Sequence, residues 1–142
     1  MNKIRQILDA KGSQVWTVGS ESTVYDALSK MAEKEVGALV VIDGERVVGV
    51  LSERDYARKV ILQGRSSLKT QVGEIMTRRV AVTHPDAAVD ECMALMTDKR
   101  IRHLPVFDGE RLAGLVSIGD LVKAIIAEQK FQIEQLERYI SS

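Results

Sequence analysis

The chain repeats itself, and this duplication constrains its fold more than any other feature of the sequence. When residues 24–55 are laid over residues 89–120 without gaps, at a constant offset of 65, 12 of 32 positions carry the same residue. Many of the other pairs are conservative, such as Val36 with Ile101. A unit of about 50 residues is too small to bury a sheet face by itself, so we expect the two copies to pack on one another.

Each copy predicts the elements β-α-β-β-α in that order. The first helix of each copy has apolar residues spaced three and four apart, which gives it one buried face. An Asp-Gly pair, typical of a tight hairpin turn, follows the second strand. In the first copy we expect a strand at 15–18, a helix cap within Ser20–Thr23, a helix face of Val24, Ala27, Leu28 and Met31, strands at 38–42 and 47–51 around Asp43-Gly44, and a second helix from Ser52. In the second copy the matching features are a strand at 80–83, a cap at Pro85-Asp86, a helix face of Val89, Cys92, Met93 and Met96, strands at 104–107 and 112–116 around Asp108-Gly109, and a second helix from Ser117.

This order predicts an α+β fold with two pseudo-symmetric repeats packed sheet to sheet and a C-terminal helical extension. We place repeat 1 with its N-terminal lead at residues 1–67, repeat 2 at 68–127 and the extension at 128–142. The helix expected from Leu121 to Ile140 carries an apolar stripe with heptad-like spacing. Its members are Ile126, Ile133, Leu136 and Ile140. The stripe must fold back on its own module or meet a second subunit, and we favour a homodimer.

The candidate binding chemistry lies where the last strand of each repeat enters a helix. Both junctions follow the pattern Gly, two apolar residues, Ser, two variable residues, Asp; they are Gly49, Ser52 and Asp55 in repeat 1 and Gly114, Ser117 and Asp120 in repeat 2. A helix N-terminus and a serine hydroxyl suit phosphate, and a carboxylate one turn later can accept two hydrogen bonds from a ribose diol. The glycine lets another backbone or a flat base approach. The alternative is structural, because Ser followed three residues later by Asp resembles a capping box.

Basic residues near these junctions are candidates for binding phosphate oxygens. Repeat 2 has Arg102 and His103 where repeat 1 has Gly37 and Ala38. The alternative for Arg102 and His103 is a solvated strand end. Arg54, with Arg58 and Lys59 nearby, could also face phosphate, or these residues could form an exposed basic helix face.

Charge and composition disfavour several other classes of protein. Lys and Arg total 20 and Asp and Glu total 20, so a broad positive field for nucleic acid or anionic membranes is absent. No apolar run is long enough to span a bilayer, and Met1–Gly12 has no signal-peptide core. We therefore expect the protein to be located in the cytoplasm and not to associate with a membrane. One cysteine, Cys92, and two scattered histidines, His84 and His103, predict no disulfide and no metal site. Cys92 is expected in the core and His84 at the surface.

The β-α-β-β-α duplication, Ile75-Met76-Thr77, Arg102-His103-Leu104-Pro105-Val106 and the two Gly-x-x-Ser-x-x-Asp junctions resemble tandem CBS domains. The resemblance covers about residues 1–127 and is to stand-alone prokaryotic CBS pairs. It implies a module with two clefts that binds AMP, ADP, ATP, NAD(H) or S-adenosylmethionine, and that often forms disc-like dimers. Among these ligands we expect AMP before the others, and we expect that its binding requires no metal.

The resemblance also implies roles for individual residues. Ser52 and Ser117 would contact phosphate, as would Arg102 and His103, and Asp55 and Asp120 would bind ribose hydroxyls. Thr77, the backbone near Val80, and Pro105 would border the adenine. Repeat 1 departs from this pattern, since Gly12 stands opposite Thr77 and Gly37-Ala38 opposite Arg102-His103. The two clefts are therefore expected to differ in affinity.

Two classes of function remain to be weighed. The first is a non-catalytic regulatory module that senses an adenine nucleotide and signals by a change of shape or assembly, through the dimer or an effector protein in trans. The second is a structural scaffold for protein interaction, without a physiological nucleotide. An enzyme would need a metal cluster or an activated base, and the sequence shows neither. Nucleic acid is disfavoured by the zero net charge.

Overall fold

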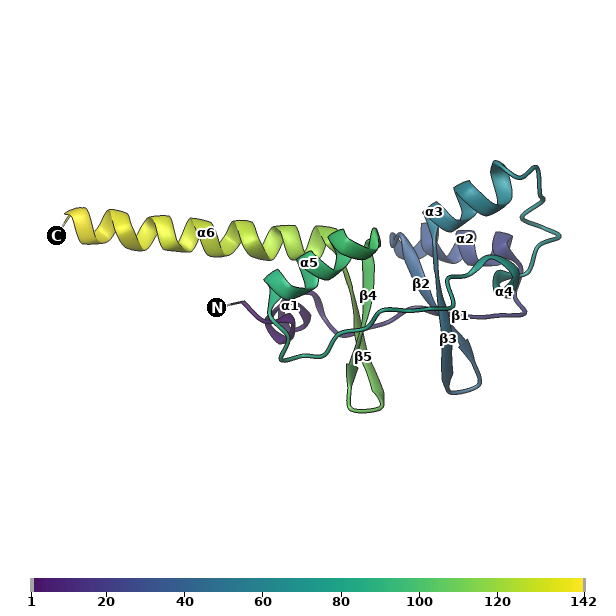
Figure 1. The fold of residues 1–142 in the computed structure, drawn as a ribbon, viewed down its shortest axis with the longest axis horizontal. Coiled ribbons are helices and arrows are strands. Elements are labelled where there is room, and N and C mark those ends of the chain that lie inside the picture. Colours follow the sequence, from purple (N-terminus) through teal and green to yellow (C-terminus); the bar gives the residue numbers. More distant parts are fainter. Residues whose placement is uncertain (1, 142) are drawn as a thin grey trace. The chain divides into compact units, whose positions relative to one another are not determined.

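The structure is a computed structural model that describes residues 2–141, and it confirms the α+β class and the two repeats (Figure 1). The chain forms two compact units. We call Val15–Val80 the repeat-1 unit, and Met1–Gln14 together with Ala81–Ser142 the repeat-2 unit. The N-terminal segment, which precedes repeat 1 in the sequence, thus belongs to the unit built around repeat 2.

The repeat-1 unit is built on a three-stranded sheet in the order β1-β2-β3. Strands β1 and β2 are parallel, and β2 and β3 form an antiparallel hairpin. Gly44, with φ +62°, takes the first position of the two-residue turn, which confirms the turn expected at Asp43-Gly44. The elements are β1 (Thr17–Gly19), α2 (Val24–Lys34), β2 (Ala38–Asp43), β3 (Arg46–Ser52), α3 (Glu53–Tyr56), a π-helical turn (Ala57–Ile61) and α4 (Val72–Ile75).

The repeat-2 unit repeats the hairpin and its turn, with Gly109 at φ +64°. Its elements are α1 (Ile4–Lys11), α5 (Val89–Lys99), β4 (His103–Asp108), β5 (Arg111–Ser117) and α6 (Ile118–Ser141). Helix α6 is unbroken over its 24 residues, and residues 131–141 are exposed throughout.

The first strand of each repeat differs from the sequence prediction. In repeat 1 it begins at Thr17 rather than at residue 15, and Trp16 precedes it. In repeat 2 the strand expected at 80–83 is reduced to a single bridge between Thr83 and Val106. The cause is Pro105. The N–H of Val40 donates to Trp16 O in repeat 1, but Pro105, which stands at the matching position, has no N–H to extend the ladder.

The helix cap expected in repeat 1 is present, and the one expected in repeat 2 is not. Thr23 caps α2 by accepting a hydrogen bond from the N–H of Asp26 at 3.1 Å. Helix α5 begins after Ala88, which offers no side-chain cap, and Asp86 instead pairs with Arg5 on α1. The first N–H of α5 donates to the carbonyl of Asn2. The first N–H of α2 likewise donates to a distant carbonyl, that of Thr70, so both helices begin against a distant backbone segment and only α2 has a side-chain cap in addition.

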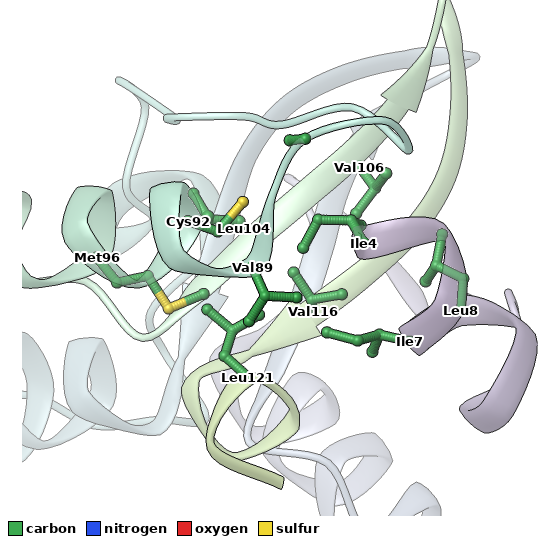
Figure 2. Packing of buried hydrophobic residues seen from close by; sticks show 11 residues of the cluster. Ile4, Ile7, Leu8, Val89, Cys92, Met96, Leu104, Val106, Val116 and Leu121 are labelled. Atoms are coloured by element: carbon green, nitrogen blue, oxygen red, sulfur yellow. The ribbon is translucent and has the colours of Figure 1, made fainter. Parts of the chain in front are cut away.

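Each unit has its own hydrophobic core. In the repeat-2 unit, helix α1 packs with α5 in one cluster on the hairpin and contributes three buried residues, Ile4, Ile7 and Leu8 (Figure 2). The remaining buried residues of this cluster are Ala87, Val89, Cys92, Met96, Leu104, Val106, Val116 and Leu121. In the repeat-1 unit the cluster is formed by Val24, Ala27, Met31, Leu39, Val41, Leu51, Val60, Val72, Ile75 and Met76.

A glycine in the return strand of each hairpin allows a distant segment to pack against it. A Cβ on Gly49 would lie 2.7 Å from the carbonyl oxygen of Thr77 and 2.8 Å from the sulfur of Met76. Val50 and Thr77 exchange two backbone hydrogen bonds at this point, of 3.0 and 2.9 Å. In the repeat-2 unit a Cβ on Gly114 would lie 2.6 Å from Leu8 Cδ2. The glycines thus allow the 76–77 segment and α1 to cover the two hairpins.

We predict that Gly49→Ala destabilises the protein by about 1–3 kcal/mol, because the new methyl group meets backbone that is held by two hydrogen bonds. Thermal unfolding followed by circular dichroism should show a fall of several degrees in Tm. The control is Gly19→Ala in β1, where the nearest atom to a new Cβ is Ser22 Oγ at 3.6 Å. Equal Tm changes in the two variants would contradict the steric explanation.

Candidate functional site

The two strand-to-helix junctions have nearly the same geometry. In the repeat-1 unit the N–H of Ser52 donates to Asp55 Oδ2 at 2.9 Å, and the N–H of Asp55 donates to Ser52 Oγ at 3.2 Å. In the repeat-2 unit the matching bonds between Ser117 and Asp120 measure 2.8 and 3.1 Å. Each pair is a reciprocal cap, so the structural interpretation of this motif holds in both repeats.

The surroundings of Asp55 bring two other predicted residues to its carboxylate. Thr77 donates to Oδ1 at 3.3 Å from the segment that crosses Gly49. Lys59, one turn along the helix, lies 3.2 Å from the same oxygen and also donates to the carbonyl of Ile75. The side chain of Asp55 therefore contacts both Ser52 and Thr77. Each of its two carboxylate oxygens has a hydrogen-bond or ion-pair partner within the repeat-1 unit.

Asp120 has a different partner. Lys11, the last residue of α1, lies 2.7 Å from Oδ2 and donates to the carbonyl of Leu115 at 3.0 Å. Burial opposes ionisation of Asp120, but the hydrogen bonds from Lys11 and from the N–H of Ser117 outweigh it and lower the pKa of Asp120 below its usual range. Among the described residues, none donates a hydrogen bond to the other oxygen, Oδ1. Asp120 is thus an ionised carboxylate with one unused acceptor oxygen.

The hairpin register places Arg102 and His103 at the Ser117 end of the repeat-2 sheet. His103 is paired with Ser117 across β4 and β5, and the N–H of Ile118 donates to the carbonyl of Arg102 at 2.8 Å. Arg102 is exposed and His103 is half-buried. These two basic side chains and the Ser117–Asp120 pair therefore belong to one end of the hairpin.

The structure also locates the remaining residues that were predicted for the site. Pro105 is buried two positions further along β4, paired with Leu115. Arg54 is half-buried in α3, between Ser52 and Asp55 in the sequence. Val80 lies three residues beyond Thr77, outside any helix or strand, and is half-buried.

Part of the hydrogen-bonding capacity of the two helix N-termini is already used. The N–H of Glu53 donates to the carbonyl of Gly37, as that of Ile118 does to the carbonyl of Arg102. The capping serines and aspartates satisfy further N–H groups. A phosphate bound here would therefore depend on side chains more than on a bare helix N-terminus.

Lys11 is the residue that sequence reasoning missed. It lies more than 100 positions from Asp120 in the sequence and shares no motif with it. The sequence contains one indication of this contact. The offset of 65 that aligns the repeats puts Lys11 opposite Met76, next to the pair formed by Gly12 and Thr77. The segment that precedes each repeat thus reaches an equivalent place on a hairpin, with Thr77 on Asp55 and Lys11 on Asp120.

Other reactive groups lie away from the junctions. Cys92 is buried as expected, burial raises the pKa of its thiol, and its sulfur lies 3.2 Å from Thr83 Oγ1. His84 is exposed. Over residues 2–141, no three His, Cys, Asp or Glu side chains are grouped so that they could hold a metal ion. The described helices include none with the length and apolar character of a membrane span.

The comparisons with known proteins agree with the duplicated architecture. The family model described as "CBS domain" matches the chain twice, at residues 6–61 and 72–127. The CBS domain-containing protein CBSX3, mitochondrial, of Arabidopsis thaliana is 44% identical over 136 residues, which cover 92% of this chain and 66% of that relative.

Two solved structures are informative. A putative signal-transduction protein with CBS domains from Burkholderia ambifaria has a TM-score of 0.88 and 56% identity, covering 90% of this chain and 96% of that one. The CBS domain pair of protein MJ0100, in complex with 5′-methylthioadenosine and S-adenosyl-L-methionine, has a TM-score of 0.80 and 25% identity, covering 90% and 98%. The two family matches, together with the two Ser–Asp junctions, show that this chain belongs to the CBS-domain family, as a pair of CBS domains.

Proposed function

We propose that the chain is a non-catalytic regulatory module that binds an adenine nucleotide at its Ser–Asp junctions, AMP in the first place and ADP, ATP or NAD(H) as alternatives. The observation that carries the proposal is the state of Asp120. Its carboxylate is fixed by Ser117, ionised, and has one oxygen without a hydrogen-bond donor. An ionised, half-buried carboxylate of this kind is a strong acceptor for the two hydroxyls of a ribose.

The charges around the repeat-2 junction fit a small number of phosphates. Arg102 and His103 enter β4 at the level of Ser117, and Lys11 reaches the junction from α1. An arginine and a histidine can donate hydrogen bonds to phosphate oxygens, and the Ser117 hydroxyl adds a further donor. This supports a nucleotide monophosphate as the ligand to test first.

The two junctions should differ in affinity. Repeat 1 has Gly37 and Ala38 where repeat 2 has Arg102 and His103, and both oxygens of Asp55 are engaged by residues of its own unit. A ribose at Asp55 must displace Thr77 or Lys59 or share their oxygen. A ribose at Asp120 can use Oδ1 directly.

Adenosine compounds as a class are supported by the likeness to MJ0100, whose domain pair is in complex with 5′-methylthioadenosine and S-adenosyl-L-methionine. The signal would pass through a homodimer or to an effector protein in trans. The second candidate function, a structural scaffold without nucleotide, is favoured by one observation. The Ser–Asp pairs cap their helices without any ligand.

We predict that AMP raises the Tm of the wild-type protein, and that Asp120→Asn weakens this ligand's binding by about tenfold or more. Asparagine keeps a capping oxygen but removes the charge-assisted acceptor. A ligand at 100 times its dissociation constant should stabilise the fold by about 2.7 kcal/mol. Thermal shift and isothermal titration calorimetry with AMP, ADP, ATP, NAD, NADH and S-adenosylmethionine provide the measurement.

The variants Asp55→Asn and Asp55→Asn/Asp120→Asn identify which junction binds. Glu53→Gln is the matched control, because it removes one negative charge from the exposed first turn of α3 without touching the Ser52–Asp55 pair. Binding to none of the six compounds would favour the scaffold function. Equal losses in Glu53→Gln and Asp55→Asn would show a general charge effect.

The Lys11–Asp120 pair predicts a pH dependence. Because folding lowers the pKa of Asp120, the pair stabilises the protein above the usual pKa of aspartate, near pH 4, and loses this contribution as the pH falls through the lower folded value. Lys11→Met should raise the pKa of Asp120, as observed by carboxyl ¹³C NMR. The variant should also lose no more than about 1 kcal/mol of stability at neutral pH, since solvent screens the half-exposed lysine.

The stability difference between wild type and Lys11→Met should shrink as both proteins are taken below pH 4. Arg5→Met is the control for the NMR measurement, because Arg5 pairs with Asp86 and its loss should leave the pKa of Asp120 at the wild-type value. A pKa of Asp120 that is unchanged in Lys11→Met would show that Ser117 alone lowers it.

A further inference from the structure

Helix α6 carries an exposed apolar stripe that continues well past its own unit. Successive members are spaced four and three residues apart in alternation, as in the core of a coiled coil. The stripe consists of Val122, Ile126, Gln129, Ile133, Leu136 and Ile140. Its apolar side chains are between 42% exposed, at Val122, and 81% exposed, at Ile140. Exposing such a row of apolar side chains to water is unfavourable, so a row of this kind typically marks an interaction surface.

The stripe is separate from the face by which α6 packs on its unit. Leu121 is fully buried, and Ala124 and Ile125 pack against the same core. At about 100° per residue, the centre of the stripe lies roughly 100° around the helix from Leu121. Because α6 is unbroken to Ser141, its distal half does not fold back to cover the stripe. The alternative in which the helix folds back on its own module is therefore wrong for this structure.

The two flanks of the stripe differ in chemistry. One flank carries the charged residues Lys123, Lys130 and Glu137. The other carries uncharged residues, namely Ile125, Gln132 and Tyr139. Such flanking residues meet across a pair of helices, so they select both the partner and the direction in which it runs.

We propose that the stripe pairs with the α6 stripe of a second copy of this chain, with the two helices antiparallel. In the register that uses the whole stripe, Ile126 packs against Leu136 of the second copy and Val122 against Ile140. Lys123 then faces Glu137 of the second copy, and symmetry makes this ion pair twice. On the other flank Ile125 meets Tyr139, and Gln132 meets its own counterpart.

The parallel arrangement matches the flanks less well. It places the charged flank of each helix against the uncharged flank of the other, so that Lys130 faces Ile125 and Glu137 faces Gln132. Its one advantage is an amide pair between the two Gln129 side chains. The antiparallel arrangement has two unfavourable features. The two Lys130 residues meet, at an exposed position where solvent screens them, and Gln129 packs against Ile133 of the second copy. We expect the two Lys123–Glu137 ion pairs and the two apolar contacts between Ile125 and Tyr139 to outweigh both.

This proposal takes up the homodimer of the proposed function but does not require nucleotide, so the test is made without ligand. Sedimentation equilibrium of the full chain over a dilution series should show a reversible monomer–dimer transition. Ile133→Asp should raise the dimer dissociation constant by about a hundredfold or more, because it places two carboxylates in the centre of the apolar seam. The side chain is 56% exposed in the monomer, so the fold should be unaffected.

Phe131→Asp is the matched control. Phe131 is 60% exposed on the same helix but lies on the side opposite the stripe, so its replacement should leave the dissociation constant within about threefold of wild type. A wild-type chain that stays monomeric, or a dimer that survives Ile133→Asp, would overturn the proposal. An equal loss in Phe131→Asp would do so as well. Nucleotide binding, measured on the same variants, reports separately on the proposed function.

The relative direction of the two α6 helices in the dimer is tested by oxidative cross-linking of chains that carry Ile126→Cys or Leu136→Cys. The native Cys92 is buried and does not interfere. A mixture of the two variants should form mixed disulfides, and each variant alone should cross-link poorly, because the antiparallel register brings position 126 next to position 136. Efficient cross-linking within Leu136→Cys alone would show parallel helices and overturn the antiparallel proposal.

Discussion

The contact between each β-hairpin and a distant segment of chain is the interaction on which the rest of the structure depends. At Gly49 and at Gly114 the absence of a side chain lets another segment come closer than any Cβ would allow. The 76–77 segment takes this place in the repeat-1 unit and helix α1 takes it in the repeat-2 unit. Helices α2 and α5 cover only part of each hairpin, and without these contacts the residues that surround Asp55 and Asp120 would not be assembled.

The side chains that stabilise the two junctions are the same ones that the proposed nucleotide site would use. Ser52 with Asp55, and Ser117 with Asp120, satisfy N–H groups at the start of α3 and α6, so the carboxylates are held in place before any ligand arrives. Prior ordering lowers the entropic cost of binding. The same arrangement explains why the motif by itself is ambiguous: a cap and a nucleotide site need the same residues at the same spacing.

The two copies have kept their backbone and diverged around the carboxylates. A threonine and a lysine of the same unit surround Asp55, whereas a lysine from α1 pairs with Asp120. The two copies also differ at the start of the hairpin. Arg102 and His103 stand at β4 where Gly37 and Ala38 stand at β2. The duplicated module therefore has two junctions with different electrostatic surroundings, while the local hydrogen bonds that build each junction remain the same.

The sequence by itself determined the repeat, the hairpins with their Asp-Gly turns, the two junctions and the apolar stripe of α6, because each depends on residues close together in the chain. The tertiary structure alone decided that α1 belongs to the repeat-2 unit and that Lys11 reaches Asp120, because nothing local links positions so far apart. It also removed the strand expected at 80–83, where Pro105 cannot supply the hydrogen bond that Val40 makes in repeat 1. Local hydrogen bonds and periodicity depend on residues close together in the sequence, whereas the partner of a half-buried charge depends on how the whole unit folds around it.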